Sequence, residues 1–312
     1  NYRTRRQYLM AAVATAGSEA SLDPASHAIR TKYPIQGKPN LRRAETDYVT
    51  GSLSNSLSSP AGGNAAFSPE TYLTGAGTGG TAPDWGVLLR GCAMSATVLE
   101  SAVTGSAVTG ATGTITLAEE GPSSVNDAYK GMVIRLTDGT GSGQVRVITA
   151  YNGTTKVASV FPNWSTTPEE GTEYSIDAGV LYRPVSSGVE LLTMARISRP
   201  NSGNVKRARS LDTAGDFTIG IAPGQNAMLN FTFRGKLPGA DDDISDPGTP
   251  VFAGAQPVPF VGAWACYFGA QDATTPFKLS SYEFRLGAQI DQFDNPNEAQ
   301  GYDGAAVLAR AP

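Results

Sequence analysis

The sequence is short of the side chains from which catalytic and metal sites are usually built. Its 312 residues include one histidine, His27, and two cysteines, Cys92 and Cys266, which stand far apart along the chain. Two isolated cysteines have no metal-ligand spacing and form no disulfide framework, so we interpret both as reduced core residues. A Ser-His-Asp or Cys-His arrangement would have to use His27, whose sequence neighbours include no residue that would orient it as a base. We therefore predict that the chain is not an enzyme and holds neither a cofactor nor a metal ion.

Charge and long apolar runs are also scarce. Charged residues make up 17% of the chain, and the formal net charge is −4. Proteins that grip the nucleic-acid backbone or an anionic membrane surface are usually basic, so neither role is favoured. No run of 18 apolar residues occurs, so no transmembrane helix is predicted. Arg3, Arg5 and Arg6 before the apolar run Tyr8 to Ala14 resemble a short secretory signal, but we interpret this segment as a first β-strand with basic flanks.

Glycine and proline are abundant, with 36 and 20 residues. Because helices tolerate neither residue well in their interior, this composition favours a mainly β chain with many turns. In the last third of the sequence Leu229, Phe231 and Phe233 alternate with polar residues. The same period of two occurs in three other segments: 189–194, 217–221 and 282–286. Such alternation is typical of half-buried antiparallel strands.

One helix is expected to flank the sheet. Thr81 is suited to cap it, Pro83 suits its first turn, and Asp84 favours the positive end of its dipole. Four apolar residues then recur at helical spacing on one face. We predict that the helix lies flat against the sheet and packs through these residues: Trp85, Leu88, Leu89 and Cys92.

The middle of the chain, residues 111–177, is predicted to be a separate β-module. Its dipeptide Asn152-Gly153 is a strong hairpin signal, and Val145 and Val147 share one face of a predicted strand. The expected strands are 114–117, 132–137, 144–150, 156–161 and 173–176. The ends of the segment lie in polar, glycine-containing stretches, as in an insertion whose ends meet. We therefore predict two domains, a core domain of residues 1–110 plus 178–312 and the inserted module of 111–177.

A long segment without regular pattern, residues 34–57, is the best candidate for a binding element. Long ordered loops inside compact domains are usually functional. This segment carries charged residues of both signs and an aromatic residue, and we predict that it is an arm between subunits. The residues that we assign to the intersubunit contact are Arg42, Arg43, Glu45, Asp47 and Tyr48. The alternative interpretation is an ordinary surface loop.

Two charged clusters occur in the last third. The run Asp241 to Asp243 lacks the spacing of a calcium loop and is interpreted as a solvated acidic loop. Lys206, Arg207 and Arg209 are too few for a nucleic-acid patch. They would either pair with an acidic loop such as 241–243 across an interface or be solvated.

The order of these features resembles the siphophage major tail tube protein family. No single motif is specific, and the resemblance lies in the succession of segments over about two thirds of the chain. The segments are Arg43 to Tyr48, Ala66 to Tyr72, Thr81 to Cys92 (TAPDWGVLLRGC), Gly215 to Ile219, the Pro223-Gly224 turn and Leu229 to Gly235 (LNFTFRG). The module 111–177 departs from the family's minimal pattern and would lie on the outer surface.

The resemblance implies a structural role in a bacteriophage virion. The fold would be a tail-tube-type β-sandwich with one flanking helix. Six copies would form a ring whose inner sheets join into a β-barrel. Stacked rings would form a tail tube around the tape measure protein and later the DNA, without sequence-specific binding, and conduct DNA into the host. Tail terminator and distal tail proteins would bind its ends, and assembly would take place in the host cytoplasm. A ring of acidic chains would repel DNA from the lumen wall.

Two other functions remain as alternatives. The first is another β-type virion protein, such as a capsid decoration protein or a tail terminator. The second is a carbohydrate-binding adhesin, which would need an aromatic-lined groove on the module. The rings available for such a groove are Tyr151, Phe161 and Trp164, which we interpret instead as part of the module core.

Overall fold

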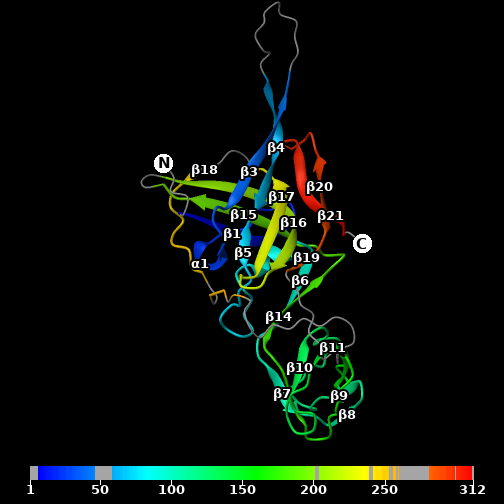
Figure 1. Ribbon diagram of the computed structural model, residues 1–312. Coiled ribbons are helices and arrows are strands. Elements are labelled where there is room, and N and C mark those ends of the chain that lie inside the picture. Colours follow the sequence, from blue (N-terminus) through cyan, green and yellow to red (C-terminus); the bar gives the residue numbers. More distant parts are fainter. Residues whose placement is uncertain are drawn as a thin grey trace, which may run out of the picture.

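The protein is mainly β, as the composition predicts. The computed structural model (Figure 1) describes residues 6–45, 58–200, 204–238, 242–252, 256–257, 259, 281–298 and 300–310. Strands account for 50% of the structure and helices for 4%. None of the helices in these described ranges is long and apolar enough to cross a membrane.

A body, a small β-module and a two-stranded ribbon between them make up the chain. The body contains α1 (Pro24–His27), α2 (Gly86–Arg90), β1 (Gln7–Ala14), β2 (Ala28–Ile29), β3 (Gln36–Ala44), β4 (Ser59–Ser68), β5 (Glu70–Tyr72), β15 (Leu191–Ser198), β16 (Val205–Ile221), β17 (Met228–Lys236), β18 (Asp242–Ile244), β19 (Tyr282–Arg285), β20 (Ala288–Asp294) and β21 (Tyr302–Arg310). The ribbon consists of β6 (Met94–Leu99) and β14 (Gly179–Pro184). The module contains β7 (Val103–Ser106), β8 (Thr109–Ala111), β9 (Thr114–Thr116), β10 (Val133–Asp138), β11 (Val145–Tyr151), β12 (Val157–Phe161) and β13 (Glu173–Ile176).

The body is built on one ten-stranded sheet that curls into a half-barrel, and β20 and β21 form a separate two-stranded sheet. Its strand order is β2-β1-β15-β16-β17-β4-β3, and β5, β18 and β19 join it at β17 and β16. The long strand β16 pairs with β15 through its first half and with β17 through its second half. Asp212 stands at the change of register, with φ +45° and a buried side chain that accepts a hydrogen bond from the Gly17 amide at 2.8 Å. Two packed sheets were expected. The described residues of the body form a sheet that bends around its core, with the two-stranded sheet of β20 and β21 against β16 and β17.

The main core lies inside the curl. It contains Leu9 and Ala11 of β1, Leu192 and Met194 of β15, and the aromatic residues of β16 and β17. The predicted alternation of β17 is confirmed, because Leu229, Phe231 and Phe233 are buried between exposed polar residues: Asn230, Thr232 and Arg234. Each buried large apolar side chain contributes roughly 1.5–3 kcal/mol.

Strand β15 is buried on both faces, although half-burial was predicted. Leu192, Thr193 and Met194 are all fully buried. The reason is a second, smaller cluster on the opposite face of β1 and β15 from the main core: Tyr8, Met10, Ala28, Ala195, Ile197 and Val205. The predicted first strand, by contrast, is confirmed as β1.

Helix α2 packs as expected but is shorter than expected. Its N-cap is Trp85, without a capping side chain, so Thr81 does not cap it. Asp84 instead accepts the backbone amides of Arg30 and Trp85, at 3.1 and 2.9 Å, which holds it outside the helix. The four predicted packing residues all lie buried in the main core: Trp85, Leu88, Leu89 and Cys92.

The module is a seven-stranded antiparallel sheet with a core of its own. The strand order is β7-β13-β10-β11-β12-β9-β8, so the sheet begins at Val103, earlier than the expected boundary at residue 111. Each of the five strands predicted in this segment is present within two residues of its expected ends. Leu99 and Gly179 face each other in the ribbon, so the chain enters and leaves the module at neighbouring points.

Strand β11 buries the face opposite to its valines. Val145 and Val147 are 47% and 42% exposed, whereas Arg146 and Ile148 are buried. Arg146 stacks over the Trp164 ring at 5.4 Å and donates to the Asn163 carbonyl and the Ser165 hydroxyl. These partners satisfy the buried guanidinium, which is why an arginine takes the inward position of this strand.

The burial of α2 generates a first prediction. Cys92 is fully buried, and burial raises the pKa of its thiol well above the ordinary value. In a Cys266→Ser variant, where Cys92 is the only thiol, the folded protein should not react with Ellman's reagent at pH 8, and the unfolded protein should react fully. Val145→Cys in the same background is the control and should react at once. Fast reaction of folded Cys92 would show that α2 is not packed as described.

The module generates a second prediction. Because its core is separate and its ends meet, residues 99–179 should fold alone. We expect one cooperative thermal transition, followed through the fluorescence of Trp164, which is 4% exposed. The reciprocal chain, with Asn-Gly in place of residues 100–178, should retain the body fold. A module that unfolds without a cooperative transition would contradict this division.

Candidate functional site

The most prominent surface feature is a hairpin arm that projects from the body. The segment predicted as a loop is for its first part the strand β3, which pairs with β4 from Gln36↔Ser68 outward to Ala44↔Ser59. Figure 1 shows the two strands leaving the body on the side opposite the module. A paired hairpin holds its direction better than a loop, so β3 and β4 fix the direction of the described part of the arm.

The predicted arm residues divide into three groups. Arg43 and Glu45 are exposed on the arm, together with Leu41, which is 61% exposed. Arg43 donates to the Ser58 hydroxyl across the hairpin at 3.3 Å. Asp47 and Tyr48 lie outside the described residues.

Arg42 belongs to the third group, because it braces the base of the arm. Its guanidinium lies 4.5 Å from the ring centre of Tyr302 on β21 and 3.3 Å from a carboxylate oxygen of Asp294 on β20. Lys236 of β17 forms a further ion pair with Glu298 of the same C-terminal hairpin at 2.5 Å. Sequence analysis placed Arg42 at a subunit interface and missed this role, because its partners lie more than 250 residues away.

Backbone contact completes the brace. The Gly63 amide donates to the Gln300 carbonyl at 3.0 Å. Gly62 has φ +89°, and a Cβ there would collide with the same carbonyl. A side chain at position 62 is therefore excluded both by the backbone conformation and by the close approach of the C-terminal hairpin.

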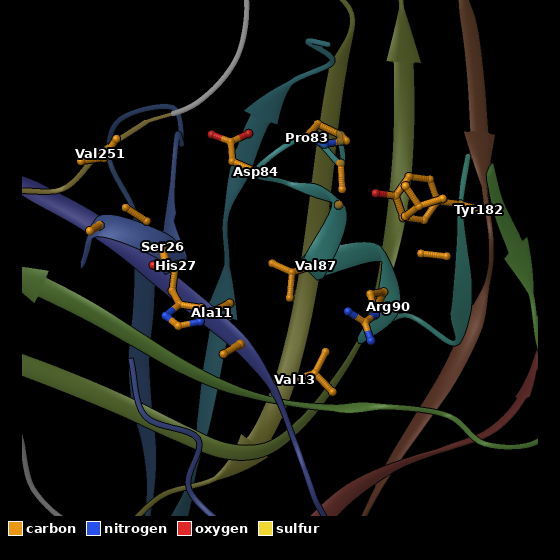
Figure 2. Close-up of a pocket in the computed structure, with 17 residues that line it drawn as sticks. Ala11, Val13, Ser26, His27, Pro83, Asp84, Val87, Arg90, Tyr182 and Val251 are labelled. Carbon is orange, nitrogen blue, oxygen red and sulfur yellow. The ribbon is translucent and has the colours of Figure 1, made fainter. Parts of the chain in front are cut away.

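A groove of about 470 Å³ lies on another part of the body, between β1, α1, α2 and the ribbon. Figure 2 shows Ala11 and Val13 of β1 along it, with His27 of α1 and Val87 of α2 on its walls. Small and aliphatic side chains supply most of the lining. Sequence analysis did not find this groove, since its walls come from segments separated by up to 240 residues.

Three polar side chains of the groove, Arg90, Asp84 and His27, are engaged within the chain. Arg90 forms a bidentate ion pair with Glu190, at 2.5 and 2.6 Å, which raises the pKa of the arginine. Burial raises the pKa of the Asp84 carboxyl, against the two amide hydrogen bonds that lower it. The Nδ1 atom of His27 accepts the Asp23 amide at 3.0 Å, so the imidazole closes the first turn of its own helix.

His27, Asp84 and Arg90, three of the side chains that could act as acid or base in the groove, hold local structure. Within the residues that the structure describes, no three His, Cys, Asp or Glu side chains gather as metal ligands. What the groove offers is apolar space beside a strand.

The basic cluster and the acidic run pair inside one chain. Lys206 and Asp243 face each other on β16 and β18, with 3.7 Å between Nζ and Oδ1. Arg209 pairs with Glu19 at 2.8 Å. The expected acidic loop is thus in part the strand β18, and Lys206 and Arg209 have acidic partners within the chain.

The net charge is confined to the module. Residues 103–177 hold eight of the 28 acidic residues and four of the 24 basic ones, which leaves 20 of each sign on the rest of the chain. The formal charge of the module is therefore −4 and that of the remainder is zero. The expected acidic lumen does not follow from the charge of the whole chain.

The aromatic groove required for an adhesin is not formed by the three expected rings. Tyr151 and Trp164 are buried in the module core, at 3% and 4% exposure, as we had interpreted them. Phe161 is instead 68% exposed on the outer face of the sheet, beside Val147 of the neighbouring strand.

The brace of the arm generates a third prediction. Arg42→Ala removes a cation–π contact and an exposed ion pair and should lower the free energy of unfolding by about 1 kcal/mol. Arg43→Ala is the matched control, with the same loss of charge one residue away, and should change it by less than about 0.5 kcal/mol. Denaturant unfolding measures both. Equal effects of the two variants would show that the brace does not stabilise the body.

Comparison with known proteins adds no relative. No family model matches the sequence, and no curated protein is significantly similar to it.

Proposed function

We propose that this chain is the structural subunit of a bacteriophage tail tube, which assembles with copies of itself into stacked rings of six that conduct DNA from capsid to host. The observation that carries the proposal is the arm: a hairpin that projects from the body, is braced by the C-terminal hairpin and exposes Leu41. An element so fixed and so exposed is suited to bind a neighbouring molecule.

Further support comes from apolar side chains that the single chain leaves uncovered. Tyr282 and Phe284 of β19 are 49% and 42% exposed, and Phe293 of β20 is 51% exposed. The sequence pattern predicted that β19 is half-buried. Joining sheets across subunits would cover these residues and the strand edges beside them, completing an intersubunit β-barrel.

The charge distribution is compatible with a DNA conduit whose body is neutral and not acidic. The body is neutral overall, so it lacks the positive charge by which proteins grip phosphates, and DNA would pass without being held. The acidic module would lie on the outside of the tube. The same proposal includes the partners and the location of the tube. The tape measure protein would lie in the lumen, and the terminator and distal tail proteins would bind the ends. Assembly would take place in the host cytoplasm, and the final location would be the virion tail.

The proposal is tested with a chain whose arm is shortened. Replacing residues 42–62 by Asn-Gly joins Leu41 to Gly63, which already face each other in the hairpin. We expect purified wild-type protein to form tubes in negative-stain electron micrographs. The shortened chain should stay monomeric, because head-to-tail contacts through the arm would be lost.

A second replacement serves as the control. Exchanging residues 45–58 for a Gly/Ser sequence of equal length retains the length of the arm and changes its chemistry. Circular dichroism must first show that all three chains are folded. Tubes from the shortened chain, or a wild-type chain that is monomeric at every concentration, would contradict the proposal.

A further inference from the structure

The two ends of the body sheet are unevenly covered. At one end β2 pairs only with Leu9 and Met10 of β1. No strand in the described part of the chain pairs with the same side of β1 from Ala11 to Ala14. At the other end lies β3, which is paired through β4 on one side only.

The groove lies along the uncovered edge of β1. Ala11, Ala12 and Val13 all line it, although successive side chains of a strand point to opposite faces. A cavity that touches all three must therefore run beside the strand and not over one face. Ala11 and Ala12 are only 2% and 8% exposed, so this edge is also recessed from solvent.

The walls leave room for a backbone. Besides the residues of β1, the lining includes Ala25, Ala82 and Ala96, whose side chains are small. A recessed strand edge with unpaired amide and carbonyl groups is the usual receptor for an added β-strand, because the incoming main chain supplies the missing partners.

The outer half of β3 is a strand that can be added. Near the body, the Gly37 carbonyl accepts a hydrogen bond from Arg196 at 2.6 Å, which closes that part of the edge. Farther out, from Leu41 to Ala44, β3 has a described strand partner on the β4 side only.

We infer that the arm of one copy adds its β3 strand to the β1 edge in the groove of a second copy. Donor and acceptor are the opposite end strands of one sheet, and the arm points away from the body (Figure 1). The β3 strand of a chain therefore cannot pair with the β1 edge of the same chain. The contact is heterologous and leaves a free arm and a free groove after every addition, so it propagates. The inference rests on the proposed self-assembly and names the surfaces that join.

The test uses two complementary variants. In the acceptor-blocked chain, Ala82→Trp and Val98→Trp fill the groove from two exposed lining positions. In the donor-deleted chain, Asn-Gly replaces residues 42–62. Neither chain alone should polymerise, whereas an equimolar mixture should form a 1:1 dimer in sedimentation velocity, because one chain keeps its arm and the other its groove.

Val145→Trp is the matched control. Val145 is 47% exposed and lies on the module, and Val98 is 46% exposed and lies in the groove. The control should polymerise like wild type. Complementation in the mixture also proves that both variants are folded, so loss of assembly cannot be mistaken for unfolding.

The outcomes separate this inference from the proposed function. A wild-type chain that never self-associates overturns both. If wild type polymerises and the acceptor-blocked chain polymerises equally well, the groove is not the receptor and the proposed function stands. Absence of a dimer in the mixture of two folded, monomeric variants also overturns the inference.

Discussion

Backbone pairing along β16 is the constraint on which the rest of the body depends. This single strand of 17 residues pairs with β15, β17, β18 and β19, so the two halves of the curled sheet share one chain segment. Its bend at Asp212 directs both halves toward the same core. Helix α2 is fixed to the strand through the Gly215 amide, which donates to the Gly91 carbonyl at 2.9 Å, and a Cβ at Gly215 would press on the Phe233 ring. The groove and the arm therefore hold their positions relative to one bent strand.

The alternation of apolar and polar residues predicted many of the strands but little of how distant segments are arranged. The strands of the module follow from alternation and from Asn152-Gly153, because hairpins are set by neighbours in sequence. Which face of β11 is buried could not be predicted from the sequence, because Val145 and Val147 are as apolar as a core pair. Only the contacts of Arg146 with residues 163–165 explain why the opposite face is buried. The start of α2 was wrong for the same kind of reason: the Asp84 carboxylate binds an amide 54 residues earlier.

The arm and the groove differ in how far each could be predicted from the sequence. The arm could be located from sequence, because a long polar segment between patterned regions is rare in a compact domain. Its paired geometry and its brace at Tyr302 could not, since they depend on the C-terminal hairpin. The groove has no sequence signal at all. Alanine and glycine carry no periodic pattern, and on our inference they form part of a binding surface only because distant segments bring them to the edge of β1.

Open strand edges carry a risk of aggregation, which this chain limits. On our inference, the chain also uses two of these edges for self-assembly. An exposed edge pairs with any extended chain, whereas an edge recessed behind small side chains admits only a narrow strand that arrives in the right direction. The body restricts both of its ends in this way: β2 and the groove walls enclose the β1 edge, and Arg196 closes the base of β3. On our inference, the edge of β1 is then the recessed acceptor and the outer half of β3 is the projecting donor. A polymer built from such a pair gains main-chain hydrogen bonds at each addition while its free subunits are protected from indiscriminate aggregation.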